Sequence, residues 1–332
     1  MKLTRRSFGI AAVTAVALAA TGCSGAESGD DANGTTNVRF GYIGDYNGAS
    51  LLAVAEQEGI WKKHGLKVET PVFTNGPLQI QALGAGDLDF GYIGPGAMWL
   101  PASGKAKVVA INTLGNADRV IAQPGITSVE ALRGKKVGVP EGTSGDMILT
   151  LALKQAGMTK QDVEVVPMDP STIVSAFVSK KIDAAGFWYP ATATIKQQVP
   201  NLVELAKNTD FADTVSFPTA FVAGNDVVDK DRGKAEKVIA ALRDAIEFRS
   251  QNPDKTIEYT AKMLKIDVAK VQADAANSQV LSLAELDQKT TDGTIGKWLT
   301  GMNDYFVQAG KLTSPVDPGT YYTGDLFTAA SK

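Results

Sequence analysis

The chain has 332 residues, of which 44% are hydrophobic and 21% charged, and its formal net charge is −3 at pH 7. The basic residues are scattered, which argues against nucleic acid as a partner, because phosphates call for a basic face. With one cysteine and one histidine the chain lacks the side chains of most hydrolase mechanisms, so we expect no metal, no cofactor and no catalytic residue.

The start of the chain predicts an export signal and a lipid anchor. Two arginines precede the apolar run 9–20, and small residues lead to Cys23. This order is typical of a secretory signal peptide, and Cys23 stands where a bacterial lipoprotein would be cut and acylated. We expect residues 1–22 to be the signal peptide, of the twin-arginine or the general secretory kind, and 23–36 a lipid-anchored flexible tether.

An acylated Cys23 would hold the protein at the extracytoplasmic face of the cell membrane, because stable anchoring generally needs two lipid signals. No stretch after residue 36 is apolar enough to span a bilayer. The sequence therefore predicts a monomer that the membrane holds by the lipid alone.

From residue 38 short apolar runs alternate with amphipathic stretches, as in strands and helices of a mainly parallel sheet. The predicted strands are 38–43, 66–73, 88–93, 106–112, 136–139, 164–167, 184–187 and 217–223. Helices are predicted to begin near Gly48, Gly76, Pro95, Thr143, Ser171 and Pro190, and a further helix is predicted within 127–135.

The end of the chain is predicted to be helical. Apolar residues recur there at three- and four-residue spacing, in 234–250, 254–264, 268–277 and 295–309. We expect these helices to wrap the first of two lobes.

Two sets of strands and helices meet around 114–123, and the chain is predicted to return at 217–223. It would thus cross twice between two lobes, with hinges at 114–123 and 213–220. The predicted lobe 1 comprises residues 37–118 and 214–332, and the predicted lobe 2 comprises 119–213.

Six loops that follow predicted strands are rich in small and polar residues. In open α/β sheets ligands bind outside the carboxyl ends of strands. The loops are 44–48, 74–77, 94–97, 141–145, 169–172 and 188–191. Three belong to each predicted lobe, so a cleft between the lobes would be lined from both sides.

Small residues at a helix start let an anionic group approach the free N–H groups at the positive end of the helix dipole. Gly96, Ala97, Thr143 and Ser144 could therefore hold a sulfonate, nitrate or carboxylate without an arginine. The alternative for each loop is that these residues only cap helices and form turns.

Aromatic and acidic residues share these loops. Trp188 and Tyr189 could close over a small ligand or could plug the core of a lobe. Asp45, Asp118 and Asp169 would make the cleft acidic, which suits a zwitterion better than a bare anion. For each acid the alternative is capping or solvation.

Three segments resemble the solute-binding proteins of ABC importers. They are 86–91 (Gly-Asp-Leu-Asp-Phe-Gly), 132–140 (Leu-Arg-Gly-Lys-Lys-Val-Gly-Val-Pro) and 181–190 (Lys-Ile-Asp-Ala-Ala-Gly-Phe-Trp-Tyr-Pro). The chain is most similar to the branch that takes taurine, aliphatic sulfonates and nitrate. The resemblance implies an α/β, two-lobed periplasmic-binding-protein fold of type II (Venus flytrap) with a helical C-terminal region. It also implies hinge closure on the solute and delivery to a permease driven by an ATPase.

The resemblance implies pocket residues as well. An acidic residue of the taurine binders stands where this chain has Asp118, whereas Tyr189 departs from the family, in which an acid or small residue often follows the tryptophan. The predicted solute is a small anion or zwitterion, with taurine or another sulfonate first and nitrate or an aromatic or other carboxylate as alternatives. The predicted ligand-binding residues are Asp45, Tyr46, Gly94, Gly96, Ala97, Asp118, Thr143, Ser144, Asp169, Trp188 and Tyr189.

Two other functions stay open. Enzymes that make pyrimidine precursors of thiamine share this architecture, and so do proteins that bind those precursors. Those enzymes rely on histidine and cysteine, and His64 lies far from the cleft loops in the sequence, so we predict a binding protein and no enzyme. A sensory or adhesive lipoprotein without an importer is the third possibility.

Overall fold

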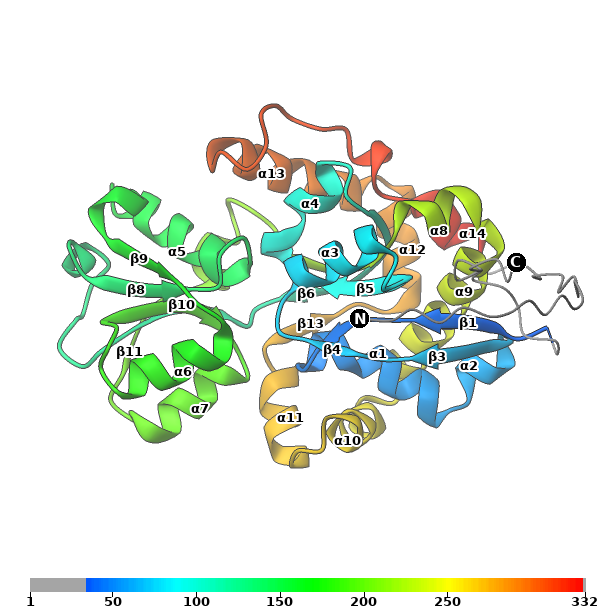
Figure 1. Ribbon diagram of the computed structural model, residues 1–332, viewed down its shortest axis with the longest axis horizontal. Coiled ribbons are helices and arrows are strands. Elements are labelled where there is room, and N and C mark those ends of the chain that lie inside the picture. Colours follow the sequence, from blue (N-terminus) through cyan, green and yellow to red (C-terminus); the bar gives the residue numbers. More distant parts are fainter. Residues whose placement is uncertain (1–33, 331–332) are drawn as a thin grey trace, which may run out of the picture.

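The computed structural model describes residues 34–330, which form two lobes joined by two crossing segments (Figure 1). The predicted signal peptide and Cys23 lie outside the described residues. The predicted tether lies outside them too, except for its last three residues, of which Thr36 already belongs to a strand.

The first lobe is built on a four-stranded sheet with the strand order β13-β6-β12-β5. Its strands are β5 (Phe90–Ile93), β6 (Lys107–Gly115), β12 (Pro218–Ala223) and β13 (Ser278–Val280). Two parallel pairs lie beside it, β1 (Thr36–Arg39) with β3 (Leu66–Glu69) and β2 (Tyr42–Ile43) with β4 (Val72–Phe73). A bridge between Phe40 and Phe90 connects the first pair to β5.

The prediction of a mainly parallel sheet is wrong for the four-stranded sheet of this lobe. Strand β12 runs antiparallel to both β5 and β6, and β13 runs antiparallel to β6. The reason is that β6 leads out of the lobe and β12 leads back into it. The two strands therefore meet in opposite directions, without a crossover helix between them.

The second lobe has a five-stranded sheet with the order β11-β7-β10-β8-β9. Strands β8, β9 and β10 are parallel, and β7 runs antiparallel to β10 and β11. The strands are β7 (Asp118–Ala122), β8 (Lys136–Val139), β9 (Glu164–Pro167), β10 (Ala184–Trp188) and β11 (Val203–Lys207).

Helices follow the strands at their carboxyl ends in both lobes (Figure 1). In the first lobe they are α1 (Tyr46–Gln57), α2 (Ile60–Lys63), α3 (Gly76–Ala85), the 3₁₀ turn η1 (Pro95–Ala97) and α4 (Trp99–Ala102). In the second they are α5 (Ser144–Gln155), α6 (Pro170–Val178), α7 (Ala191–Gln198) and the 3₁₀ turns η2 (Glu130–Leu132), η3 (Lys160–Asp162) and η4 (Asn208–Phe211).

The helix predicted within 127–135 is wrong, because only the 3₁₀ turn η2 forms there. Leu132 is its one buried residue. A single apolar anchor gives a longer helix no face to pack against the lobe.

The C-terminal region is helical as predicted, and most of it packs on the first lobe. Helices α9 and α10 lie against α1, and α14 lies against α9 and β6. The bounds are α8 (Asn225–Lys230), α9 (Arg232–Gln251), α10 (Pro253–Leu264), α11 (Val268–Ala275), α12 (Leu283–Thr291), α13 (Thr294–Gln308) and α14 (Gly324–Ala329).

Helix α13 also reaches the second lobe, which the sequence did not predict. The hydroxyl of Tyr305 donates to the carbonyl oxygen of Met147 at 3.5 Å, and Lys154 of α5 donates to the side chain of Gln308. This helix therefore contacts both lobes.

The two crossing segments are tied to each other by hydrogen bonds. The N–H of Gly115 donates to the carbonyl of Phe217 at 2.8 Å. Further along, the N–H of Asp118 donates to Oδ1 of Asn208 at 2.7 Å, and Nδ2 of Asn208 donates back to Oδ2 of Asp118 at 2.8 Å. The reciprocal pair fixes where the second lobe begins.

Two carboxyl groups hold the start of α1. Asp45 is its N-cap and accepts from the N–H of Gly48 at 2.7 Å, while Asp274 of α11 accepts from the N–H of Tyr46 at 2.7 Å. Asp274 is 5% exposed, and burial raises its pKa to about 6. The attachment of α11 to α1 therefore uses a carboxyl group that resists ionisation.

Replacing Asp274 by asparagine should change how stability depends on pH. Asparagine keeps an oxygen for the N–H of Tyr46 but cannot ionise. In the parent the folded state holds this proton more tightly than the unfolded state, whose aspartate has a pKa near 3.9, so the free energy of unfolding falls as pH rises from about 4 to about 6. We expect the stability of Asp274→Asn relative to the parent to be roughly 2 kcal/mol more favourable at about pH 7 than at about pH 4.

Urea unfolding of both proteins at the two pH values measures this difference. A stability difference that is the same at both pH values would contradict the raised pKa of Asp274.

Candidate functional site

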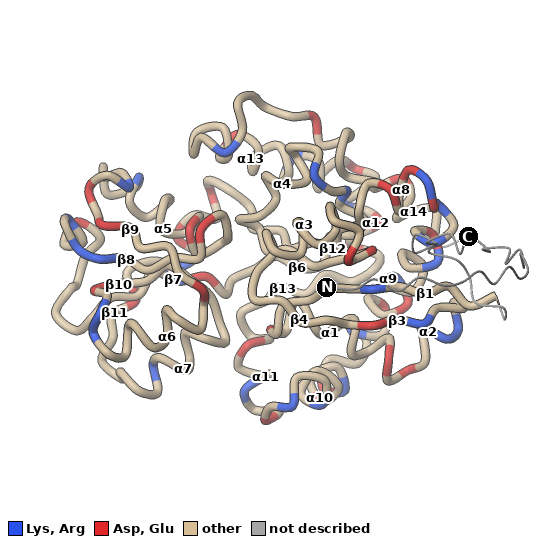
Figure 2. The backbone as a smooth tube through the Cα atoms, viewed as in Figure 1, with Lys and Arg blue, Asp and Glu red and all other residues tan. Residues whose placement is uncertain are grey.

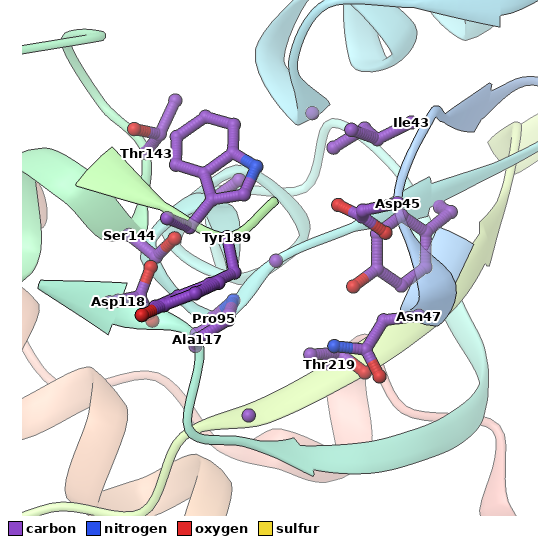
Figure 3. A pocket seen from close by; sticks show the side chains of 16 residues that line it. Ile43, Asp45, Asn47, Pro95, Ala117, Asp118, Thr143, Ser144, Tyr189 and Thr219 are labelled. Atoms are coloured by element: carbon purple, nitrogen blue, oxygen red, sulfur yellow. The ribbon is translucent and has the colours of Figure 1, made fainter. Parts of the chain in front are cut away.

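A small cavity lies between the lobes, beside the crossing segments (Figure 3). Its volume, measured to the centres of water molecules, is about 40 Å³. This volume counts only the positions that water centres can take, so the space that a bound molecule can fill is larger. The lining residues are Ile43, Asp45, Asn47, Gly76, Tyr92, Gly94, Pro95, Ala97, Gly115, Ala117, Asp118, Thr143, Ser144, Trp188, Tyr189 and Thr219.

The lining comes from strand ends and helix starts of both lobes. In the first lobe, β2 leads to Asp45 and β5 leads to Gly94. In the second, β8 leads to the start of α5 at Thr143 and Ser144, and β10 ends at Trp188. These are the carboxyl ends at which α/β sheets bind ligands.

Asp45 faces the cavity from the first lobe, on the side opposite Asp118 and Ser144 (Figure 3). It is 6% exposed, and its carboxylate accepts hydrogen bonds from backbone N–H groups at the start of α1. Burial raises its pKa well above the ordinary value, and the neighbouring Asp274 raises it further. The Asp45 carboxyl group therefore resists ionisation.

Asp118 faces the cavity from the crossing segment. Its carboxylate accepts hydrogen bonds from Nδ2 of Asn208 and from the hydroxyl of Ser144. Burial raises its pKa, because these hydrogen bonds and the neighbouring Arg119 offset only part of the desolvation. The carboxyl group of Asp118 therefore lies beside the start of α5, where a hydroxyl of that helix donates to it.

Arg119 stands behind the cavity wall and does not line it. Its guanidinium lies 5.2 Å from the centre of the Tyr189 ring, donates to the carbonyls of Asn116 and Asp118, and forms an ion pair with Glu204. Two carboxyl groups and no lysine, arginine or histidine are present among the residues that line the cavity.

Aromatic rings form much of the remaining wall. Tyr189 is held by the hydrogen bond from its N–H to the carbonyl of Ala117 at 3.1 Å, and Trp188 precedes it. Tyr92 of β5 lies on the opposite lobe, where burial and then the charge of Asp45 raise its pKa well above the ordinary value. Tyr92 is therefore a neutral hydroxyl.

The lobes touch through backbone next to the cavity. A Cβ atom added to Gly96 would lie 2.1 Å from the carbonyl carbon of Thr143 and 2.2 Å from the nitrogen of Ser144. Only glycine allows η1 to approach α5 this closely. The structure is thus a closed arrangement at this point.

Eight of the eleven residues predicted to bind ligand line the cavity. Gly96 seals the contact between the lobes instead. Tyr46 packs between Ala261 and Val271, and Asp169 is exposed at the N-cap of α6.

Several lining residues were not predicted, notably Asn47, Tyr92 and Thr219. Asn47 lies in one of the six loops, where its neighbours Asp45 and Tyr46 were chosen. Tyr92 and Thr219 lie inside apolar strands. The sequence feature that could have identified them is a polar side chain within a buried strand that adjoins a predicted loop or crossing segment.

Two other kinds of functional feature, a metal site and a membrane-spanning helix, are absent from the part of the chain that the structure describes. Within residues 34–330 no group of three or more His, Cys, Asp or Glu side chains is placed to hold a metal ion. No helix in that range is long and apolar enough to cross a bilayer. Figure 2 shows lysine and arginine scattered over both lobes, with no continuous basic face in this view.

Comparison with known proteins confirms the predicted resemblance and fold class. The family model described as NMT1/THI5 like matches residues 49–256. A protein of Brucella abortus (strain 2308) that is named as a binding protein is 57% identical over 292 residues, which cover 88% of this chain and 92% of that protein. An aliphatic sulfonates-binding protein of Bacillus subtilis (strain 168) is 25% identical over 304 residues, 86% of this chain and 88% of its own.

Among solved structures, the alkanesulfonate-binding protein SsuA of Xanthomonas axonopodis pv. citri, bound to MOPS, superposes with a TM-score of 0.68. It is 20% identical, and the match covers 86% of this chain and 97% of that one, which shows the fold. The chain belongs to the NMT1/THI5-like family and has the two-lobed periplasmic-binding-protein fold of type II.

Proposed function

We propose that the protein is the extracytoplasmic solute receptor of an ABC importer, which captures a small solute between its lobes and delivers it to a permease driven by an ATPase. The observation that carries the proposal is the cavity at the crossing segments, lined from both lobes. The family, with relatives named as binding proteins for sulfonates, supports the same role. Anchoring through a lipid on Cys23 and a monomeric state belong to this proposal.

The lining narrows the range of solutes predicted from the sequence. Among them taurine has the feature that the other predicted anions lack, an ammonium group that could pair with the carboxylates of Asp45 and Asp118. Nitrate, a simple sulfonate or a carboxylate brings no cation, and a buried negative charge beside another is costly.

A binding role also accounts for the chemistry of the cavity better than an enzymatic one. The lining includes no histidine and no cysteine. His64 ends α2, and its Nε2 lies 2.9 Å from Oδ2 of Asp244, so it is engaged on the outside of the first lobe. No nucleophilic side chain of the lining lies beside a base whose pKa has its ordinary value.

In this proposal closure is a hinge movement about the crossing segments. Contacts away from the cavity would stabilise the closed form. Nε1 of Trp99 donates to the carbonyl of Gly142 at 3.4 Å, and Nζ of Lys311 lies 3.7 Å from Glu141. A solute that touches both lobes adds to these contacts and shifts the protein toward the closed form.

Gly96→Ala should prevent closure. The added Cβ would overlap the backbone at Thr143 and Ser144, which belong to the other lobe. We expect the radius of gyration from small-angle X-ray scattering to stay at its ligand-free value when solute is added, and the affinity to fall at least about tenfold. Folding should be unaffected, because the contact forms only on closure.

Gly84→Ala is the matched control, since a Cβ at this glycine of α3 meets nothing within 4 Å. This variant should bind and contract like the parent. Parent-like contraction of Gly96→Ala would refute closure through this contact.

Trp188→Ala should weaken solute binding without unfolding the protein, because the indole is part of the wall and only partly buried. We expect a loss of about tenfold or more in affinity, measured by calorimetry, with a melting temperature close to that of the parent. Trp298→Ala removes a partly buried indole of α13 outside the cavity and should leave affinity unchanged. Equal affinity of Trp188→Ala and the parent would remove the cavity from the proposal.

A further inference from the structure

The size of the cavity limits what can be enclosed in it. A volume of about 40 Å³ is far below the several hundred Å³ of sites for drug-sized ligands. A sulfonate enclosed here beside the ammonium group of the same molecule would meet no lysine, arginine or histidine among the lining residues.

The charge of the cavity limits the ligand further. Asp45 and Asp118 face it from opposite sides (Figure 3), and Asp274 adds a third carboxyl group behind Asp45. The two nearby arginines are engaged elsewhere, Arg119 with Glu204 and Arg249 with Asn112 and Ser50. The lining therefore supplies no positive charge to balance Asp45 and Asp118.

The geometry of the wall favours a cation with N–H donors. The Asp45 carboxylate accepts only backbone hydrogen bonds from the protein, and that of Asp118 accepts from Asn208 and Ser144. Both have lone pairs left for a donor in the cavity. The rings of Trp188 and Tyr189 supply aromatic surface that attracts a cation.

We infer that the cavity selects a compact organic cation with several N–H donors, of the guanidinium or short alkylammonium class, and not an anion or an amino sulfonate. Asp45 and Asp118 accept its hydrogen bonds from the two lobes, so the same contacts that recognise the cation also join the lobes. This inference rests on the proposed capture function, since it names the solute class of that site.

Calorimetry on the parent protein tests the inference with five probes: guanidinium, methylammonium, tetramethylammonium, taurine and methanesulfonate. We expect guanidinium or methylammonium to bind at least about a hundredfold more tightly than taurine, methanesulfonate and tetramethylammonium. Tetramethylammonium carries the charge without N–H donors, so its failure would show that hydrogen bonding is required. Tight binding of methanesulfonate would overturn the inference.

Asp45→Asn and Asp118→Asn should each lower the affinity for the bound cation by about tenfold or more. Asp226→Asn removes an exposed carboxylate of α8 and is the matched control, with unchanged affinity expected. If either cavity variant folds poorly, the pH dependence of the parent decides. Cation affinity should fall as pH is lowered from about 8 to about 5 and the carboxyl groups gain protons, whereas anion affinity would rise.

Scattering measured on the same samples separates this inference from the proposed function. Taurine that binds and contracts the protein, while both N–H cations do not bind, would overturn the inference and leave the capture function standing. A cation that binds without contraction would support the inference and contradict capture by closure. Failure of both N–H cations to bind overturns the inference in every case.

Discussion

The reciprocal hydrogen bonds between Asp118 and Asn208 hold together the place where the chain passes between lobes. Asp118 begins the first strand after the outward crossing, and Asn208 lies just before the return. The strand ends of both sheets meet at this junction, so the loops with polar and aromatic side chains converge on it. The cavity, the contact at Gly96 and the proposed hinge all depend on this junction.

Asp118 also contributes to the electrostatics of the site. An N-terminal helix end usually attracts an anion, and at the start of α5 the carboxylate of Asp118 lies close enough to accept a hydrogen bond from the hydroxyl of Ser144. The start of α1 is likewise occupied by Asp45 and Asp274. Carboxyl groups of the protein therefore lie beside the starts of both helices, and Asp45 and Asp118 line the cavity.

The fold could be predicted well where local signals and tertiary structure agree. Strands 136–139 and 164–167 form with the predicted bounds, since each is a short apolar run between loops. Strands β7 and β11 were missed because only pairing with each other and with β10 makes them strands. In the site, the sequence identified the loops that form the cavity but not all of the side chains that line it. Asp169 follows the edge strand β9, far from the junction, and the backbone of Tyr46 rather than its ring serves the start of α1.

Helix α13 gives the C-terminal region influence over a site that it does not touch. It packs on α4 and α12 of the first lobe and contacts α5 of the second lobe through Tyr305 and Gln308, and none of its residues lines the cavity. Apparent affinity depends on how often the free protein visits its binding-competent form as well as on contacts with the solute. Changes in the sequence of α13 can therefore shift the solute concentration at which the protein is half-saturated, while the residues that contact the solute stay the same.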